Sequence, residues 1–302
     1  MQGYAIRRFR LLWVLVMHAM LPVWLIFLMS VEGRDDSTAW MMLLVASAAY
    51  VAYISIAGSW SWFGIHAQRG MPMVLVVAAF VTRPRFVSVN NSAQAAELRL
   101  AIVALAGWFL LWTAWALLGR RAGRESLGLV FPLKSGTFMV AQGGSTRPVN
   151  RHAKSQAQRY AVDLVQLGGL GMRADGIYPV ALRKYAIFGS EVVSPCDGLV
   201  VAAVDDLPDN IPPVRDFHNP EGNHVAIQFE GGTVYLCHLM KGSVTVDVGK
   251  RVKTGRVIGR VGSSGESAEP HLHIHAQQGE RGIALRFAGR FLVRNDTVEA
   301  TD

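Results

Sequence analysis

The sequence has very few cysteines and no repeated or low-complexity segments. Only Cys196 and Cys237 occur among 302 residues, which excludes a disulfide-rich scaffold and a zinc finger built on cysteine ligands. A single disulfide between them remains an alternative to two unpaired thiols, because the sequence does not give the Cα separation that a bridge requires. The lack of internal repeats excludes a solenoid architecture.

Acidic residues are scarce in the first part of the chain. Up to Glu125 there are 11 Lys and Arg residues against 5 Asp and Glu, a net charge of +6, whereas the remainder has 19 against 17, a net of +2. The basic excess therefore lies in the more apolar part, where Arg residues typically flank membrane spans. A nucleic-acid-binding face would need clustered Lys and Arg on the soluble part, so we expect no nucleic-acid partner.

Long uncharged stretches dominate the first 125 residues. Three are long enough to cross the roughly 30 Å of hydrocarbon in a bilayer, and they run over Leu11–Val31, Ala39–Phe63 and Leu100–Leu118. The first follows Arg7, Arg8 and Arg10 and is longer than the apolar core of a cleaved signal peptide. Trp60 and Trp62 are expected to lie at the membrane interface. These features predict a membrane anchor in contact with the lipid bilayer.

The stretch Met71–Val81 leaves the number of spans open. It is apolar for only 11 residues and precedes Arg83 and Arg85, so it is either a re-entrant or interfacial segment or a short fourth span. With the N-terminus inside, three spans place the second half of the chain outside the cytoplasm, and four place it inside. The distribution of Arg residues does not choose between the two counts.

From about Lys134 the pattern changes to short β-rich runs broken by Gly, Pro, Asn and Asp, which is typical of a mainly antiparallel sheet. The expected strands are Thr137–Val140, Tyr160–Val165, Leu199–Val204, His224–Phe229, Thr233–His238, Arg256–Val261 and His271–Ala276. We therefore predict an α-helical membrane bundle over residues 1–125 and a linker over 126–135. A β-rich domain over 136–295 and a tail over 296–302 would follow.

Histidines are concentrated in the second half, which holds seven of the nine. His271, His273 and His275 alternate with Leu and Ile, so in a strand the three imidazoles share one face and the apolar residues pack on the other. Imidazole is a strong zinc ligand, and a catalytic zinc site needs three protein ligands and one position for water. The pattern indicates a metal site. The alternative is a polar outer face that happens to be rich in histidine.

The residues around this motif follow a specific order. A glycine-rich run from Gly249 to Gly265 leads into Glu269-Pro270-His271-Leu272-His273, with His238-Leu239 upstream and Ala161-Val162-Asp163 further back. In this order, the chain resembles the lysostaphin-type (LytM-like) zinc metallopeptidases of the bacterial cell wall over roughly residues 136–277. The resemblance implies a peptidase-like β domain, Zn²⁺ as the cofactor and peptidoglycan peptides as partners.

The resemblance also implies roles for individual residues. Asp163 matches a carboxylate zinc ligand and His273 a histidine zinc ligand, whereas His238 and His271 match two catalytic histidines that do not bind the metal. Zinc lowers the pKa of its bound water to near 7 and polarises a peptide carbonyl. One imidazole would accept a proton and another would stabilise the oxyanion.

One position departs from the family pattern. The usual first histidine ligand lies four residues before the aspartate, and Arg159 occupies that place. A permanent cation cannot coordinate zinc. We predict that His152, 11 residues before Asp163, supplies the missing ligand from a preceding loop. The alternative is a loop histidine that binds no metal.

The sequence also raises the question of where the side chains of His275 and Tyr235 lie. His275 either supports His273 as a hydrogen-bonding neighbour or lies on the surface, and both interpretations stay open. Tyr235 is two residues before Cys237 and shares a face with it in a regular strand, rather than with His238. We therefore expect Tyr235 in the core or in a cleft wall.

The leading hypothesis is a membrane-anchored zinc metalloendopeptidase that hydrolyses peptide bonds of peptidoglycan. It requires the β domain outside the cytoplasmic membrane, which selects three spans and predicts a multi-pass inner-membrane protein with a periplasmic C-terminal domain. The alternative is an inactive peptidase-like domain that binds cell wall or regulates a cell-wall hydrolase, which Arg159 supports. A further alternative interprets the glycine-rich run from Val248 to Val261 as a lipoyl- or biotinyl-carrier domain. Such a domain would need a lysine in a hairpin of the carrier type, and no lysine sits in one here.

Overall fold

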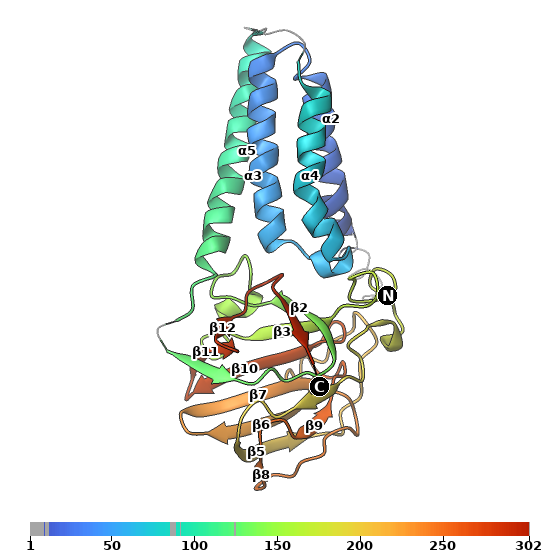
Figure 1. The fold of residues 1–302 in the computed structure, drawn as a ribbon, viewed down its shortest axis with the longest axis vertical. Helices are drawn as coiled ribbons and strands as arrows, with labels where there is room; N and C mark the ends of the chain where they lie inside the picture. The colour runs from blue at the N-terminus through green and yellow to red at the C-terminus, as the bar shows by residue number, and fades with distance from the viewer. Residues whose placement is uncertain (1–8, 10–11, 85–88, 91, 124, 302) are drawn as a thin grey trace.

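A helical bundle stands on a β domain in the computed structural model (Figure 1). The structure describes residues 9, 12–84, 89–90, 92–123 and 125–301. The basic residues expected beside the spans at Arg7, Arg8, Arg10, Arg85 and Arg124 lie outside these residues. The chain therefore has the predicted fold class, with apolar helices first and a mainly antiparallel β domain second.

The bundle contains four helices that are long and apolar enough to cross a membrane. They are Leu12–Val31, which includes the π-helix η1 (Val16–Met20) and α2 (Leu21–Val31), then α3 (Ser37–Ala57), α4 (Ile65–Thr82) and α5 (Ala93–Leu118). By length and composition all four are candidate spans, including the fourth that the sequence left open. Helix α4 starts at Ile65, six residues before the apolar stretch that begins at Met71. The apolar stretch is shorter than the helix because the first turns of the helix carry the polar His66 and Arg69.

Local sequence determines where α3 and α5 begin. The Asp36 carboxylate accepts hydrogen bonds from the N–H groups of Thr38 and Ala39, and the Ser92 hydroxyl accepts one from the N–H of Ala95. Such N-cap residues satisfy helix N–H groups that have no partner within the helix. Arg99 of α5 also pairs with Asp36 at 2.6 Å, which joins the two helices at the end of the bundle far from the β domain.

The four successive helices return the chain to the end of the bundle at which it began. Trp13, near the start of the first span, lines the same cleft as residues of the β domain. Helix α5 ends at Leu118, shortly before the first strand of that domain. Crossing by all four helices would place the start of the first span and the β domain on the same side of the membrane, whereas three spans would place them on opposite sides.

The β domain is built around one large sheet. Its strands are β1 (Ser126–Leu129), β2 (Gly136–Gln142), β3 (Val162–Gln166), β4 (Glu191–Val193), β5 (Gly198–Val204), β6 (Asn223–Phe229), β7 (Gly232–Leu239), β8 (Arg251–Val252), β9 (Val257–Arg260), β10 (Leu272–Gln278), β11 (Arg281–Phe287), β12 (Arg290–Phe291) and β13 (Thr297–Ala300). The order is β13-β2-β3-β10-β7-β6-β5-β8, with β11 joining β10, β1 and β12, while β4 and β9 pair separately. All seven predicted strands are present, with ends shifted by one or two residues.

The two segments that we predicted as a linker and a tail contain strands. The predicted linker, residues 126–135, includes β1, which pairs with β11 in parallel. The predicted tail, residues 296–302, includes β13, which pairs with β2. Both strands are short and lie at edges of the sheet, where hydrophobic alternation is weak.

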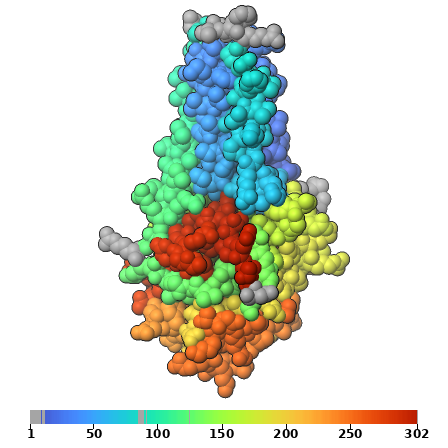
Figure 2. All heavy atoms as spheres, viewed as in Figure 1, coloured from blue at the N-terminus to red at the C-terminus, as the bar shows by residue number. Residues whose placement is uncertain are grey.

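The β domain contacts the bundle directly through the connection between α3 and α4, residues 58–64, which we call the bundle loop. The Arg294 guanidinium donates hydrogen bonds to the carbonyl of Gly58 and to the hydroxyl of Ser59. The Asn295 side chain donates to the carbonyls of Ile56 and Gly58. Figure 2 shows the C-terminal residues, in red, packed against the lower ends of the helices.

Aromatic residues of the bundle loop fill this junction. Trp62 is 2% exposed and packs on Tyr178 of the β domain, with ring centroids 4.1 Å apart, and edge-on against Tyr185. Trp60 is buried against His18 of the first span. The interpretation of both tryptophans as membrane-interface anchors is therefore wrong, because their rings are taken up by contacts within the protein.

Candidate active site

Three neighbouring strands place Asp163, His273 and Cys237 in one row. Strand β10 pairs with β3 and β7, and the register sets His273 opposite both Asp163 and Cys237. The Nδ1 atom of His273 lies 2.8 Å from Oδ1 of Asp163. Leu272 and Ile274, which alternate with the histidines, are buried in the core. The two-faced strand predicted from the sequence is therefore present.

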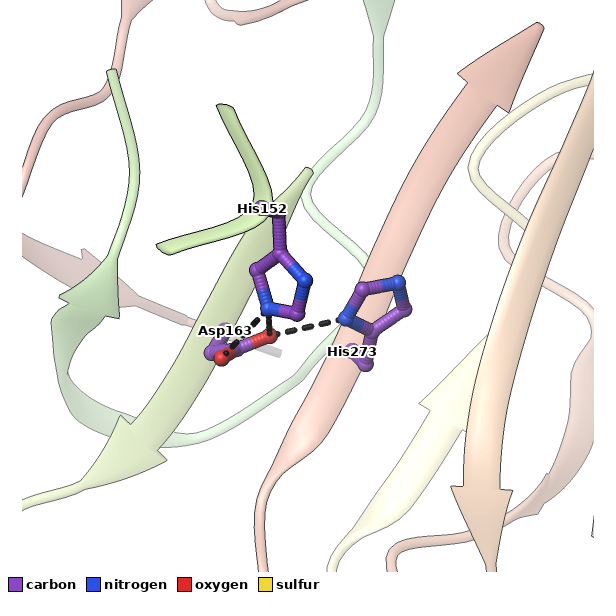
Figure 3. Close-up of side chains that lie close together, drawn as sticks. All are labelled: His152, Asp163 and His273. Carbon is purple, nitrogen blue, oxygen red and sulfur yellow. Dashed lines mark hydrogen bonds and ion pairs between the residues drawn. The ribbon is translucent and has the colours of Figure 1, made fainter. Parts of the chain in front are cut away.

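His152 reaches this row from the 3-10 turn η3 (Arg151–Lys154). Its Nε2 atom lies 3.0 and 3.2 Å from the two carboxylate oxygens of Asp163. Its ring centroid is 4.6 Å from that of His273. Figure 3 shows the three side chains pointing toward one another from a turn and two separate strands. The structure thus brings together the three residues that we predicted as metal ligands.

Asn150, which sequence reasoning missed, holds the turn that carries His152. It is fully buried, and its Oδ1 accepts a hydrogen bond from the N–H of His152 at 3.0 Å. Its amide nitrogen donates to the carbonyls of Gly144, Arg159 and Ala161. An asparagine two residues before His152 is a typical N-cap, and that signal was available in the sequence.

Arg159 does not face the three candidate ligands. Its side chain is exposed, and the guanidinium lies 5.8 Å from the ring centroid of Tyr160. It lines a separate cleft of about 450 Å³ that Glu125 and Arg281 also line. The place beside Asp163 is taken by His152 instead.

The three side chains fit a divalent metal ion. Within the described residues, His152, Asp163 and His273 are the one group of His, Cys, Asp or Glu whose ligand atoms all lie within 4.8 Å of one another. Two imidazole nitrogens and one carboxylate oxygen form a donor set that zinc accepts, with bonds of about 2 Å. Three protein ligands leave a fourth, tetrahedral position for water or substrate.

His275 and Tyr235 lie behind the ligand His273. The Nδ1 atom of His275 is 3.0 Å from Nε2 of His273, the nitrogen that points away from Asp163. His275 is buried, and its ring stacks on Tyr235 with centroids 4.8 Å apart. A hydrogen bond to the second nitrogen of a metal-binding imidazole fixes its orientation. Of the two interpretations of His275, the structure favours the hydrogen-bonding neighbour over the surface residue.

His238 enters the site through an irregularity in β7. Asn223 pairs with Leu239 and His224 pairs with Cys237, so His238 is the extra residue of a β-bulge. Its φ of +65° is rare for a residue with a side chain. In a regular strand His238 and Cys237 would face opposite sides, but the bulge brings the His238 ring centroid within 5.7 Å of that of His273.

His271 and His238 are oriented in the same way. The Nδ1–H of His271 donates to the carbonyl of Glu269 at 2.8 Å, and that of His238 donates to the carbonyl of Ser264 at 2.9 Å. A carbonyl only accepts, so in the neutral rings the proton sits on Nδ1 and Nε2 is left as a base. The two ring centroids are 4.8 Å apart, and Nε2 of His271 lies 3.8 Å from Oδ1 of Asp163.

Burial and the single carboxylate shift the pKa values of these groups in different directions. Burial raises the pKa of Asp163, but the neighbouring His152 and His271 outweigh it and hold that pKa well below its ordinary value. Burial lowers the pKa of His152, but the Asp163 carboxylate outweighs it and raises that pKa. Burial, together with His271 and His273, lowers the pKa of His238 far below its ordinary value, so His238 is neutral at pH 7.

Arg173, another residue that sequence reasoning missed, connects the bundle loop to His271. Its side chain is buried, and Nε donates to the hydroxyl of Ser61 at 2.8 Å. Its guanidinium also pairs with the carboxylate of Glu269, whose main-chain carbonyl accepts the hydrogen bond from His271. The membrane bundle therefore helps to position a residue of the site, and no sequence motif indicated this link.

Both cysteines are unpaired, so the disulfide left open by the sequence is not formed. Cys237 is buried in the row beside His273, and burial raises the pKa of its thiol well above the ordinary value. Burial raises the pKa of Cys196 to about 11. Both thiols are therefore protonated at pH 7.

The five predicted site residues open into one cleft of about 560 Å³ between the bundle and the β domain. On the domain side it is lined by His152, Asp163, His238, His271 and His273. On the bundle side it is lined by Trp13, Val14, Met17, His18, Tyr53 and Trp62. Substrate bound at the candidate metal site would therefore lie at the level where the helices meet the β domain.

Comparison with known proteins identifies part of the chain. Residues 183–284 match the model of peptidase family M23. The matched segment contains His238, His271 and His273, while His152 and Asp163 lie upstream of it. The match confirms the family resemblance that the sequence motifs carried.

Solved structures of similar proteins share low sequence identity with this chain. A zinc-containing peptidase from Vibrio cholerae is 19% identical, over 54% of this chain and 39% of that one, with a TM-score of 0.33. A putative M23 peptidase from Pseudomonas aeruginosa is 16% identical, over 65% and 62%, with a TM-score of 0.32. Lysostaphin from Staphylococcus simulans is 20% identical, over 42% and 44%, with a TM-score of 0.28. The chain spans less than two thirds of the length of each.

Proposed function

We propose that this chain, which carries a peptidase family M23 domain, is a membrane-anchored zinc metalloendopeptidase that hydrolyses peptide bonds of peptidoglycan. The observation that carries the proposal is the convergence of His152, Asp163 and His273 into one donor set, with His238 and His271 beside it in the same cleft. A metal-ligand group next to two imidazoles is the arrangement that amide hydrolysis by activated water requires.

The proposed mechanism assigns each residue a task. His152, Asp163 and His273 would hold Zn²⁺, which supplies a bound water with a pKa near 7 and polarises the peptide carbonyl. His238 and His271 both line the cleft with their Nδ1–H groups bonded to carbonyls, so in a neutral ring Nε2 is the nitrogen that can accept a proton. One of them accepts the proton of the attacking water and passes it to the leaving amine. An imidazole protonated at Nε2 can also donate a hydrogen bond to the developing oxyanion.

The main objection to catalysis was Arg159, and its side chain is turned away from the site. It was the best support for an inactive domain that binds cell wall or regulates a hydrolase. Because His152 lies beside Asp163 instead, the donor set has three members. We therefore favour the enzyme over the binding module.

A peptidoglycan substrate places the β domain on the periplasmic side of the inner membrane. Because four spans return the chain to its starting side, the N-terminal segment is proposed to be periplasmic too. Among the described residues, the cations near the domain end of the bundle are Arg69, Arg120 and Arg121, and those near the far end are Arg34, Arg83 and Arg99. In the sequence, Arg7, Arg8, Arg10 and Arg124 also flank the first set of helix ends and Arg85 the second, which makes the count 7 against 4. The positive-inside rule therefore argues against this orientation, which rests on the proposed substrate.

Elemental analysis and a hydrolysis assay on the full chain test the activity. We expect about one zinc ion per purified chain, as three protein ligands and one open position imply. The protein should release new amino groups from purified peptidoglycan, a chelator should abolish the release, and added zinc should restore it. A full chain that holds no zinc in any preparation, and leaves peptidoglycan intact, would contradict the proposal.

A fusion protein tests the orientation. A reporter enzyme that is active only in the periplasm should be active when fused after Glu125, and a cytoplasm-specific reporter should be inactive there. The reverse pattern would place the candidate site in the cytoplasm and remove peptidoglycan as its substrate.

A further inference from the structure

The bundle side of the cleft is fixed in place. Arg294 binds the bundle loop through Gly58 and Ser59, and Arg173 binds it through Ser61. Arg173 is buried and Arg294 is half-buried, and both also line the cleft. Hydrogen bonds to charged groups are stronger than those between neutral groups, so these contacts hold the bundle loop against the β domain, and the bundle forms one wall of the cleft.

Three cations at the edge of this cleft have no acidic partner. Arg147, Arg151 and Lys154 are exposed and line the cleft, and none forms an ion pair among the described residues. We call these three residues the cationic rim. By contrast, Arg173, which lines the same cleft, is paired with Glu269. The rim is therefore available for an anionic ligand.

The opposite wall is apolar and lies near the membrane. Trp13 and Met17 belong to the first span, and Tyr53 lies in the last turns of α3. Trp13 is 58% exposed, so the apolar wall continues from the cleft onto the outer surface of the bundle that faces lipid. A ligand in the cleft would thus touch cations on one side and a membrane-facing apolar surface on the other.

We propose that the substrate of this site is a peptide carried by an anionic membrane lipid, whose phosphate headgroup binds the cationic rim while the peptide lies over the metal site. The inference rests on the proposed function and narrows its substrate class. Lys and Arg side chains near a membrane surface attract anionic headgroups, and several together attract them more strongly. A peptide carried by a lipid diffuses in the plane of the membrane. It would therefore reach the cleft at the level where the helices meet the β domain.

Three forms of one peptide test the proposal on the full chain in vesicles of uncharged lipid. The peptide is a cross-linked stem peptide released from purified peptidoglycan, used free, coupled to an uncharged diacylglycerol, or coupled to a long-chain alkyl phosphate. We expect the phosphate-anchored form to have a kcat/KM on the order of tenfold above the uncharged-anchor form, since each rim cation contributes through an exposed contact. The free form should be the poorest substrate.

A triple variant assigns the preference to the rim. In R147Q/R151Q/K154Q we expect the ratio of kcat/KM between the phosphate and uncharged anchors to fall to about one, with zinc content unchanged. The matched control is K250Q/R251Q/R256Q, which removes three exposed cations within residues 250–256, on and beside β8 and outside the lining of the cleft. Strand β8 lies at the end of the domain far from the bundle. The control should keep the wild-type ratio.

Binding measurements separate this inference from the proposed activity. If no form is hydrolysed, the proposed activity fails, and fluorescence anisotropy of labelled peptides on the full chain still tests the inference. Tighter binding of the phosphate-anchored form that is lost in the rim variant would support it. Two results would overturn it. One is equal binding of the two anchored forms, which is also expected if the true ligand is a segment of a membrane protein. The other is binding of the free form as tight as that of the phosphate-anchored form.

Discussion

Two parts of the candidate site are held by different kinds of structure. Asp163 and His273 face each other in the regular register of β3 and β10, where the sheet itself fixes their separation. His152 lies on a short 3-10 turn that Asn150 holds, and His238 lies on a bulge with a positive φ. Regular pairing needs no strain, whereas a bulge and a left-handed residue persist only because surrounding contacts maintain them. Positions of the second kind should depend more on their neighbours.

The largest effect is expected where the regular pair is broken. Asp163→Asn and His273→Ala should each abolish stoichiometric zinc binding, because either change leaves two protein ligands. Elemental analysis of the purified full chain measures this. The isosteric control is Asp197→Asn, which changes an exposed carboxylate paired with Lys253 and should keep zinc. Full zinc content in Asp163→Asn would remove Asp163 from the donor set.

Variants of His152 and Arg159 test which residue supplies the third metal ligand. His152→Ala should lose zinc, because its Nε2 lies 3.0 Å from the carboxylate of Asp163. Arg159→Ala should keep both zinc and activity, because its exposed guanidinium faces a separate cleft. Competition against a zinc-binding dye compares the two affinities. Undiminished affinity in His152→Ala would show that the turn is not part of the metal site.

The residues outside the donor set should affect turnover without affecting metal. His271→Ala and His238→Ala should keep zinc and lower kcat by about 10²- to 10⁴-fold, the usual contribution of a general acid or base. Steady-state kinetics and elemental analysis on the same preparation measure both. His218→Ala changes an exposed loop histidine and serves as the control. Loss of zinc in His271→Ala would make it a ligand instead.

Asn150 tests whether the irregular part of the site depends on its support. Asn150→Ala should weaken zinc binding by about 10- to 100-fold, as loss of a residue that orients a ligand does. It should also lower the free energy of unfolding by about 2 kcal/mol, because buried carbonyls lose their donor. Asn150→Asp keeps the acceptor for the N–H of His152 and should retain more affinity. Equal affinities in both variants would argue against that hydrogen bond.

The smallest effect is expected at Cys237, which lies in the same row as the ligands. Burial keeps its thiol protonated, so we do not expect it to bind metal. Cys237→Ala should keep zinc and activity and lower the free energy of unfolding by about 1 kcal/mol, the cost of a small buried cavity. Chemical denaturation and elemental analysis check both. Loss of zinc would show that the row supplies a fourth protein ligand.

The membrane bundle was predicted with mixed success for a physical reason. Three candidate spans follow from uncharged stretches, and each stretch contains a helix, but α3 ends at Ala57 rather than Phe63 and α5 begins at Ala93 rather than Leu100. The apolar stretch Met71–Val81 was too short to predict α4 as a span, because the first turns of α4 hold His66 and Arg69 where the helix meets the β domain. Composition alone does not distinguish a polar turn at a membrane interface from a loop.

Within the β domain, local periodicity was enough for the regular residues. Alternation at a period of two placed His273 on one face and Leu272 and Ile274 on the other. The same rule failed for His238, because the bulge in β7 depends on pairing with β6 and leaves no trace in hydrophobic alternation. The resemblance to known peptidases, rather than periodicity, placed His238 in the site.

By itself, the sequence determined the apolar helices, the β domain, the alternating histidines and the family model that residues 183–284 match. These follow from hydrophobicity, periodicity and motif order, which are local properties. Only the tertiary structure decided that His152 rather than Arg159 stands beside Asp163, and that the cleft has the membrane bundle as one wall. Both depend on contacts between segments far apart in the chain, such as Arg173 with Ser61 and Glu269, which no local pattern records.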